Sequence, residues 1–514
     1  MLTNTFVHDY WDAHTNTPLV VRFPPEPNGA LHIGHAKALL LNNDLALHYN
    51  GTLNLRMDDT NPKEERAEFE EMIKRDTAWL GATVDKFTRA SDVFDDLAAL
   101  ARKLIAEGLA YTDVSNASEV AARKRPPNEA EVASPNRTES ASVHRERFEK
   151  MLRGEYPVGS CVLRARWDLA SPHMIKRDPI LWRVVEHRHP HKSEWAALPM
   201  YDFAHPFTDV CEGIGVSLCS LEFETRRPLY DWVAAHAVRL GFGGVTPVEL
   251  EFARMELDCG FTSKRKIKKA IEDGAVRGWD DPRLLTIAGL RAKGVPAAAI
   301  RALVERTGVS RALSTVPLEW LNEEVRELGK NAPAVWMIEH PVELHIEGMP
   351  ETVLDVPYNK NDESLGARPL HFGENMVVDA SDVSLVASSD FFRLAVGNHV
   401  RLMGCGAIIE VVEVKERAGR PVLVRAKLSE RTKAKATIHA LHAKHNRPLS
   451  IHTIEWWDGE SASEDCWTTV SGVMEETPWS NHFVHAVRLG FGAWLNEDPR
   501  NGWVKTCAIR PSRK

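Results

Sequence analysis

The sequence predicts an α/β fold for the first half of the chain and a β-rich fold for its last third. Over residues 19–100, strand-like and helical runs alternate in the order VVRF, HAKALLLNNDLALHY, TLNLRMDD and EERAEFEEMIKRDTAWLG. This rhythm is typical of a parallel, doubly wound sheet. From residue 331, short β-like runs are separated by turn residues, which is typical of β-barrels or sandwiches.

The region between these two parts changes composition twice. Residues 101–115 predict a helix, whereas residues 116–146 are rich in Arg, Pro, Ser and Asn and predict an irregular, exposed stretch. A short helix (RFEKMLRG) and a strand (SCVLRARWDL) follow, and apolar runs return from Leu198 onward. Residues 263–330 are predicted to be mainly helical.

The bulk composition is that of an ordinary globular protein with several domains. Its 514 residues suggest about three or four domains of ~100–200 residues each. A net charge of −8 excludes a globally basic nucleic-acid coat but permits local positive grooves. No apolar run approaches ~18 residues and no signal-peptide pattern opens the chain, so we expect a cytoplasmic protein without a membrane partner.

Seven cysteines are scattered singly, without Cys-x-x-Cys spacing, which argues against a disulfide framework and a zinc ribbon. They are Cys161, Cys211, Cys219, Cys259, Cys405, Cys466 and Cys507.

The most informative segment is RFPPEPNGALHIGHAK at residues 22–37, which predicts a strand, a tight turn and a helix start. A helix N-terminus attracts phosphate, because its first N–H groups are expected to be unpaired and its dipole is positive there. His32 and His35 add donors, and Gly34 would let a ligand approach the backbone. Alternatively, Gly34 only allows close packing, but that reading explains the whole run poorly.

This run resembles the ATP-binding motif of class I aminoacyl-tRNA synthetases, in the form seen in glutaminyl and related glutamyl enzymes. The segment Thr262-Ser263-Lys264-Arg265-Lys266 resembles the mobile Met-Ser-Lys-Arg-Ser loop of that class, with Thr262 in place of methionine. The alternative for this segment is a solvated basic loop. The resemblance implies that His32, His35 and Lys264 are catalytic and that Lys264 stabilises the leaving pyrophosphate. The implied ATP-binding residues are Glu26, Asn28, Gly34, Arg254, Ser263 and Lys264.

The resemblance also implies the domain organisation. A split Rossmann-type catalytic domain would occupy 1–100 and 201–262, with an inserted α+β domain at 101–200 that binds the tRNA acceptor stem. A helical subdomain that carries the Ser-Lys-Arg-Lys loop would follow at 263–330. Two C-terminal β-barrels at 331–514 would read the anticodon.

The amino-acid pocket is expected at the carboxyl ends of the strands. Asp58 follows the run LNLRM, and the resemblance assigns it to the substrate ammonium group, with Arg22 and Tyr201 completing the pocket. Asp59 or Thr60 would cap the turn. The same comparison places Ser217, Cys219 and Phe223 in the pocket.

Cys219 is the residue that decides between glutamine and glutamate as the expected substrate, because the glutamyl relatives typically carry an arginine at its position. Cys219 supplies no cation, so we expect no guanidinium for a γ-carboxylate, and a neutral γ-amide is favoured. As an alternative, Cys219 is a small core residue. Glu249 lies where bacterial glutaminyl enzymes usually carry glutamine. It could accept from the amide and repel glutamate, or disturb the site and raise KM.

The tRNA contacts implied by the resemblance are Arg137, Arg393 and Arg401; the alternative is that they are ordinary exposed arginines. Ala334 stands where the family carries an anticodon-reading arginine after Asn-Ala-Pro, so that contact is missing.

The sequence therefore predicts a monomeric ligase that uses ATP with Mg²⁺, glutamine and tRNA(Gln), without a protein-only metal site. The alternatives are a glutamyl-tRNA synthetase, a shortened glutamyl paralogue that modifies tRNA bases, and a catalytically impaired RNA-binding descendant. The chain also lacks glutamine entirely, where a frequency of roughly 4% would give about twenty. We interpret this as deliberate removal, or as selection for a protein made without its own product.

Overall fold

A computed structural model describes residues 18–63, 65–258, 260, 262–312, 315–456, 467–475, 484–486, 489–494 and 503–507. The chain forms two compact units, Met1–Glu256 with Val304–Thr315, and Leu257–Leu303 with Val316–Lys514. Cys259 and Cys466 lie outside the described residues, as does the side chain of Cys507. The other four cysteines are free thiols.

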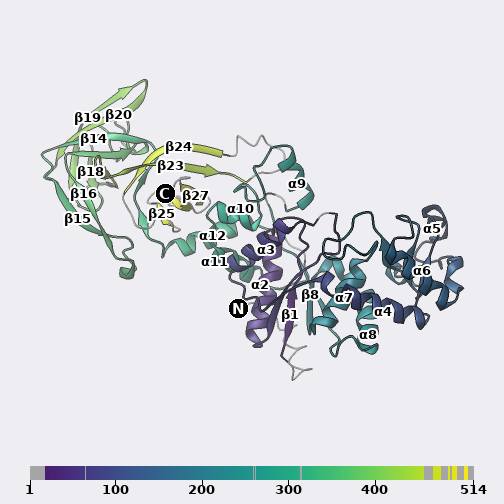
Figure 1. The fold of residues 1–514 in the computed structure, drawn as a ribbon. Helices are drawn as coiled ribbons and strands as arrows, with labels where there is room; N and C mark the ends of the chain where they lie inside the picture. Colours follow the sequence, from purple (N-terminus) through teal and green to yellow (C-terminus); the bar gives the residue numbers. More distant parts are fainter. Residues whose placement is uncertain are drawn as a thin grey trace. The chain divides into compact units, whose positions relative to one another are not determined.

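Parallel strands organise the first unit. The strands β1 (Val20–Phe23), β2 (Thr52–Met57) and β3 (Lys86–Arg89) pair in parallel, joined by α2 (Ile33–His48) and α3 (Ala67–Trp79). A second parallel pair, β8 (Val216–Ser220) and β9 (Val248–Phe252), is connected through α8 (Arg227–Arg239). The Gly215 N–H donates to the Val20 carbonyl at 2.9 Å, which places β8 beside β1 (Figure 1). The predicted parallel α/β sheet is confirmed.

Between β3 and β8 the chain builds an antiparallel sheet with helices. Its strands are β4 (Ala110–Asp113), β5 (Val162–Ala165), β6 (Ile180–Val184) and β7 (Ala197–Pro199), in that order, and its helices are α4 (Phe94–Ala106), α5 (Ala117–Arg123) and α6 (Ala141–Arg153). The prediction that 116–146 is wholly irregular was wrong. Asn116 and Glu119 form a capping box that starts α5. The short helix expected at RFEKMLRG is the end of α6, which buries Phe148 and Met151.

This antiparallel region shares one hydrophobic core with α7 (Tyr201–Glu212) and α8. Phe148 and Trp182 belong to the same buried cluster as Phe203 and Phe207 of α7. The core therefore fixes α7, the helix that supports the site described below, against the inserted sheet.

Helices dominate the segment after β9, as predicted. They are α9 (Lys264–Glu272), α10 (Ile287–Ala292), α11 (Ala297–Thr307) and α12 (Leu318–Gly329), with a short strand pair of β10 (Glu256–Leu257) and β11 (Thr315–Val316). The prediction that Lys264 lies in a loop was wrong, because α9 begins at Lys264 with Ser263 at its N-cap position. Ile267 and Ala270 are buried on one face of α9 and hold the helix down.

Most described strands of the second unit form two curled sheets, beside the separate antiparallel pair β15–β16. In the order β21-β18-β19-β20-β14-β17-β22, the edge strands β21 (Ala436–Ile438) and β22 (Leu441–His442) are consecutive in the chain. In the order β12-β25-β26-β27-β23-β24-β13, the edge strands β12 (Ala334–Val335) and β13 (Met337–Ile338) are also consecutive. Each sheet must curl to bring its edges together, which agrees with the predicted β-barrels.

The remaining strands are β14 (Pro341–Glu347), β15 (Thr352–Pro357), β16 (Ala367–Phe372), β17 (Asn375–Asp379), β18 (His399–Leu402), β19 (Ile408–Arg417), β20 (Arg420–Leu428), β23 (Arg447–Ile454), β24 (Trp467–Met474), β25 (Val484–Ala486), β26 (Gly490–Trp494) and β27 (Trp503–Cys507). In the part of the chain that the structure describes, we find no helix long and apolar enough to cross a membrane.

Candidate functional site

Two histidines cap the first helix and orient each other. The Gly34 N–H donates to His32 Nδ1 at 3.1 Å, and the His32 N–H donates to His35 Nδ1 at 3.1 Å. The two ring centroids lie 3.8 Å apart. Because each Nδ1 accepts a hydrogen bond, a neutral ring carries its proton on Nε2. The pair therefore presents two Nε2–H donors at the positive end of the α2 dipole.

The first turn of α2 has fewer unpaired N–H groups than predicted. The N–H groups of His35 and Ala36 donate to the His32 carbonyl at 2.8 Å and 3.3 Å, and that of Gly34 donates to the His32 ring. The prediction of unpaired donors was wrong for these three groups, because His32 caps them. Attraction of a phosphate here depends on the imidazoles and the dipole.

Gly34 makes room for the His32 ring. A Cβ atom at Gly34 would lie 2.9 Å from His32 Cε1 and 3.2 Å from the Met255 carbonyl oxygen. Only glycine avoids both contacts, so the close-packing explanation for Gly34 is confirmed. Approach of a ligand to its backbone stays a prediction.

Two further residues assigned to ATP lie in the turn before α2. The Asn28 N–H donates to the Glu26 carbonyl at 2.9 Å, and Asn61 Nδ2 lies 3.4 Å from the Glu26 carboxylate. Arg254 follows β9 with 51% of its side chain exposed, and pairs with Glu222 at 3.2 Å and Glu256 at 3.0 Å.

The other predicted ATP residues, Ser263 and Lys264, belong to the second unit. There Ser263 is exposed and Lys264 is half-buried at the start of α9.

Asp58 and Asp59 follow β2 and have different surroundings. Asp59 is buried and accepts from the Ser91 N–H at 2.9 Å and the Ser91 hydroxyl at 2.6 Å, so it fixes the loop after β3. Asp58 accepts from the Thr60 hydroxyl at 3.0 Å. Burial, together with the charge of Glu26, raises the pKa of Asp58 to about 7. A cationic group that binds there would favour the ionised form of Asp58.

Arg22 is fully buried and joins β1 to β8 and α7. Its guanidinium lies 3.2 Å from Asp209 and donates to the Leu218 carbonyl at 2.9 Å. It also lies 2.5 Å from Ser217 Oγ and 3.5 Å from Cys219 Sγ. The structure thus brings together Arg22 and Cys219, which were both assigned to the pocket, and a guanidinium lies beside the thiol although Cys219 itself supplies no cation.

Asp209 neutralises that guanidinium, and sequence reasoning missed it. Burial opposes ionisation of Asp209, but Arg22 and Arg56 outweigh it and hold the pKa of Asp209 well below its usual range. Arg56 lies 2.6 Å from Asp209 and 3.1 Å from Glu212, and the Tyr230 hydroxyl donates to Asp209 at 2.8 Å. Two buried cations thus face two buried carboxylates.

Helix α7 carries a polar stripe that could have revealed this network. Tyr201, His205, Asp209 and Glu212 recur at the spacing of one helix face in a helix that is otherwise mainly apolar. His205 Nε2 lies 2.6 Å from the Arg22 guanidinium. A row of polar residues on a buried helix predicts partners across the core.

Tyr201, Phe223 and Glu249 lie around the same strands. The Tyr201 ring is 5.7 Å from Phe223, and burial with the nearby charge of Asp58 raises the pKa of Tyr201 well above its usual range. Glu249 pairs with Ser217 across β8 and β9 and is only 2% exposed. Burial raises the pKa of Glu249 to about 7.

The three arginines assigned to tRNA contact all have partners within the chain. Arg137 lies 2.7 Å from Asp178 and donates to the Trp167 carbonyl at 3.1 Å, so it holds the antiparallel region together. Arg393 donates to Asp382 at 2.8 Å and keeps 40% of its side chain exposed. Arg401 is partly exposed and donates to the Gly406 and Thr432 carbonyls, each at 2.8 Å.

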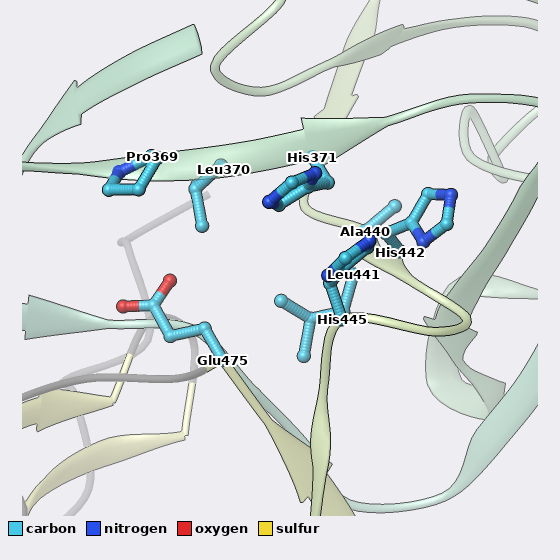
Figure 2. A pocket seen from close by; sticks show the side chains of 8 residues that line it. All are labelled: Pro369, Leu370, His371, Ala440, Leu441, His442, His445 and Glu475. Carbon is cyan, nitrogen blue, oxygen red and sulfur yellow. The ribbon is translucent and has the colours of Figure 1, made fainter. Parts of the chain in front are cut away.

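A separate pocket lies in the second unit, within its β-rich part. Figure 2 shows His371 and His445 face to face, with Glu475 on the other side of the pocket. The two rings are stacked at a centroid distance of 3.7 Å, and Arg368 lies 3.0 Å from Glu475. Among the described residues, no cluster of three or more His, Cys, Asp or Glu side chains is arranged to hold a metal ion.

Two family models match most of the chain. The family model "tRNA synthetases class I (E and Q), catalytic domain" matches residues 18–326, and the model of the anti-codon binding domain of the same class matches residues 332–429.

Individual relatives match most of the chain. The chain is 37% identical to a glutamine–tRNA ligase of Clostridium perfringens over 88% of this chain and 84% of that protein. It is 41% identical to a glutamine–tRNA ligase of Actinobacillus succinogenes over 78% of this chain and 72% of that protein. A crystal structure of glutamate-tRNA synthetase from Elizabethkingia anophelis matches with a TM-score of 0.45 and 18% identity, over 61% of this chain and 71% of that one.

Proposed function

The chain belongs to the class I tRNA synthetases for glutamate and glutamine, and we propose from this premise how its residues carry out the reaction. Relatives with 36–41% identity over most of the chain are glutamine–tRNA ligases, so the chain is a ligase that forms aminoacyl-tRNA. ATP, an amino acid and tRNA are its substrates. Magnesium enters with ATP, as part of that substrate.

The first step joins glutamine to AMP. A carboxylate oxygen of glutamine attacks the α-phosphorus of ATP, and the bond from that phosphorus to the bridging oxygen of pyrophosphate breaks. No proton needs to be removed from the attacking carboxylate, so positioning and neutralisation of charge carry the rate. In the second step a terminal ribose hydroxyl of tRNA(Gln) attacks the acyl carbon of the adenylate, and AMP leaves.

The observation that carries the proposal is the reciprocal cap of His32 and His35 at the start of α2. Each ring accepts a hydrogen bond at Nδ1, so its neutral form carries the proton on Nε2 and donates to a phosphate oxygen without further protonation. Lys264 supplies the positive charge for the departing pyrophosphate. The resemblance also assigns Glu26, Asn28, Gly34, Arg254 and Ser263 to ATP.

The amino-acid site lies beside β1, β2 and β8. Asp58 accepts from the substrate ammonium group, and Tyr201 and Phe223 bound the side-chain pocket. Ser217 and Cys219 line the same pocket, and both contact Arg22. Arg22 is committed to Asp209, so it serves as a support of the pocket wall and is not available to a γ-carboxylate.

We assign tRNA binding to two other regions of the chain. Residues 101–200 would receive the acceptor end, and the curled sheets of 331–514 would bind the anticodon through Arg393 and Arg401. Arg137 we assign to holding the inserted domain together, because Asp178 and Trp167 occupy its guanidinium. We propose a monomer that works in the cytoplasm, where its three substrates are available.

Aminoacylation of a tRNA(Gln) transcript tests the proposal. With ATP and either labelled amino acid, we expect glutamine and not glutamate to be attached to the tRNA. Attachment of glutamate instead would identify a glutamyl-tRNA synthetase, and tRNA binding without attachment of either would identify an impaired RNA-binding descendant.

A further inference from the structure

Strand β9 carries two buried glutamates that differ in their partners. Glu251 lies 3.4 Å from the Arg227 guanidinium and 2.9 Å from that of Arg311. Glu249, two residues earlier on the same face, forms no ion pair among the described residues, and its Oε2 has no hydrogen-bond partner. Among the described residues, the fold therefore pairs Glu251 with two guanidinium groups and leaves Glu249 without an ion pair.

The charges around Glu249 are already balanced without it. Arg22 and Arg56 face Asp209 and Glu212, so an ionised Glu249 adds one uncompensated negative charge. The Cys219 thiol is its hydrogen-bonding neighbour on β8, and burial keeps this thiol protonated by raising its pKa to about 12. The groups that face Glu249 or the guanidinium beside it are Cys219 and Ser217 of β8, Arg22 of β1, His205 and Asp209 of α7, Tyr230 of α8, and Glu251 of β9.

We propose that Glu249 is the residue with which this site rejects glutamate, because its unpartnered oxygen accepts from the γ-amide nitrogen of glutamine and repels a γ-carboxylate. This inference rests on the proposed function and concerns discrimination between the two amino acids. An amide nitrogen gives the buried oxygen the donor that it lacks. A γ-carboxylate offers no donor, and the nearby guanidinium is committed to Asp209.

The discrimination should depend on pH. Burial raises the pKa of Glu249 to about 7, so its ionised fraction increases between pH 6 and pH 8. The γ-carboxylate of glutamate, with an ordinary pKa of about 4.3, stays ionised throughout this range. Below pH 7 the Glu249 carboxyl can donate its proton to that carboxylate and tolerate glutamate. Above pH 7 the two charges repel each other, whereas glutamine remains a donor to Glu249.

The experiment is ATP–pyrophosphate exchange in the presence of tRNA, with glutamine or glutamate, at pH 6.0, 7.0 and 8.0. For the wild-type protein, we expect the ratio of kcat/KM for glutamine over glutamate to rise roughly 10- to 100-fold from pH 6.0 to pH 8.0. In Glu249→Gln the ratio should be independent of pH. Glu251→Gln is the matched control, because that carboxylate is paired, and it should keep the wild-type rise.

The outcomes separate this inference from the function on which it rests. A wild-type ratio that does not change with pH, or the same rise in Glu249→Gln, would overturn the role of Glu249 while leaving glutamine activation intact. Loss of exchange with both amino acids at every pH would contradict the proposed function itself. If Glu249→Gln does not fold, calorimetric binding of glutamine and glutamate to the wild-type protein at pH 6.0 and 8.0 gives the same ratio, and a constant ratio overturns the inference.

Discussion

His32 and His35 fix each other through the backbone: the His32 N–H donates to His35 Nδ1, while His32 Nδ1 accepts from Gly34. One pair of hydrogen bonds therefore starts helix α2 and sets the tautomer of both rings. The cap and the proposed phosphate binding use different nitrogens of the same imidazole, so substitutions can separate them.

Replacing His32 by asparagine should separate these two roles. Asparagine is a good N-cap residue, so His32→Asn should keep the unfolding free energy within about 0.5 kcal/mol of wild type. It loses the Nε2–H donor, so we expect kcat of ATP–pyrophosphate exchange to fall on the order of 100-fold. His32→Ala should lose the activity and also about 1 kcal/mol of stability. Equal activity of His32→Asn and wild type would contradict this assignment.

Replacing Gly34 by alanine should displace the His32 ring. The new Cβ would meet His32 Cε1 at 2.9 Å and the Met255 carbonyl at 3.2 Å, and backbone atoms yield less readily than a ring. We expect KM for ATP to rise about tenfold or more, with a smaller effect on KM for glutamine, in steady-state exchange assays. An unchanged KM for ATP would show that the ring position is not important for binding.

Replacing Lys264 by alanine should affect the reaction more than ATP binding. A charge that acts on the leaving pyrophosphate is used in the transition state, so kcat should fall on the order of 100-fold with little change in KM for ATP. Lys269→Ala is a suitable control, since Lys269 is exposed on the same helix and pairs with Asp273. A raised KM with unchanged kcat would assign Lys264 to ground-state binding instead.

Asp58 should make glutamine binding depend on pH. Its pKa is raised to about 7, and the ionised form is the one that accepts from a substrate ammonium group. KM for glutamine should therefore fall as pH rises from 6 to 8. Asp58→Asn should raise KM on the order of 100-fold and remove this dependence. A pH profile of KM for both proteins checks it, and an unchanged profile in the variant would exclude Asp58 as the titrating group.

Glu249 should lower the stability of the protein above neutral pH. Its pKa rises from 4.5 to about 7 on folding, so between these values the folded state binds more protons than the unfolded state. The unfolding free energy should therefore fall as pH rises through this window. Glu249→Gln removes the titrating group, and at pH 8 it should be more stable than wild type by roughly 1–3 kcal/mol. Denaturant unfolding at pH 5 and pH 8 measures the difference, which should be small at pH 5.

Local sequence patterns predicted most helices and strands but not every segment. The octapeptide HAVRLGFG occurs at 236–243 and 485–492. His236–Arg239 ends helix α8, whereas His485 and Ala486 lie in strand β25. The same residues therefore form a helix in one place and a strand in the other, depending on the elements against which they pack. Local propensity cannot decide between these two conformations. Lys264 is a similar case, because the burial of Ile267 stabilises a helix in the basic segment.

Candidate site residues can be named from the sequence where a motif is contiguous, whereas partners that depend on packing across the core are missed. His32, Gly34 and Asp58 lie within short segments whose turn and strand patterns can be recognised in the sequence. Asp209 is neutralised by Arg22, 187 positions away, and no local pattern contains both residues.

The measurement that tests the central claim most directly is tRNA-dependent ATP–pyrophosphate exchange by the wild-type protein, with glutamine and glutamate compared at saturating ATP. The account predicts exchange with glutamine, at a rate that glutamate does not approach at pH 8. Exchange that is faster with glutamate, or absent with both amino acids, would contradict it.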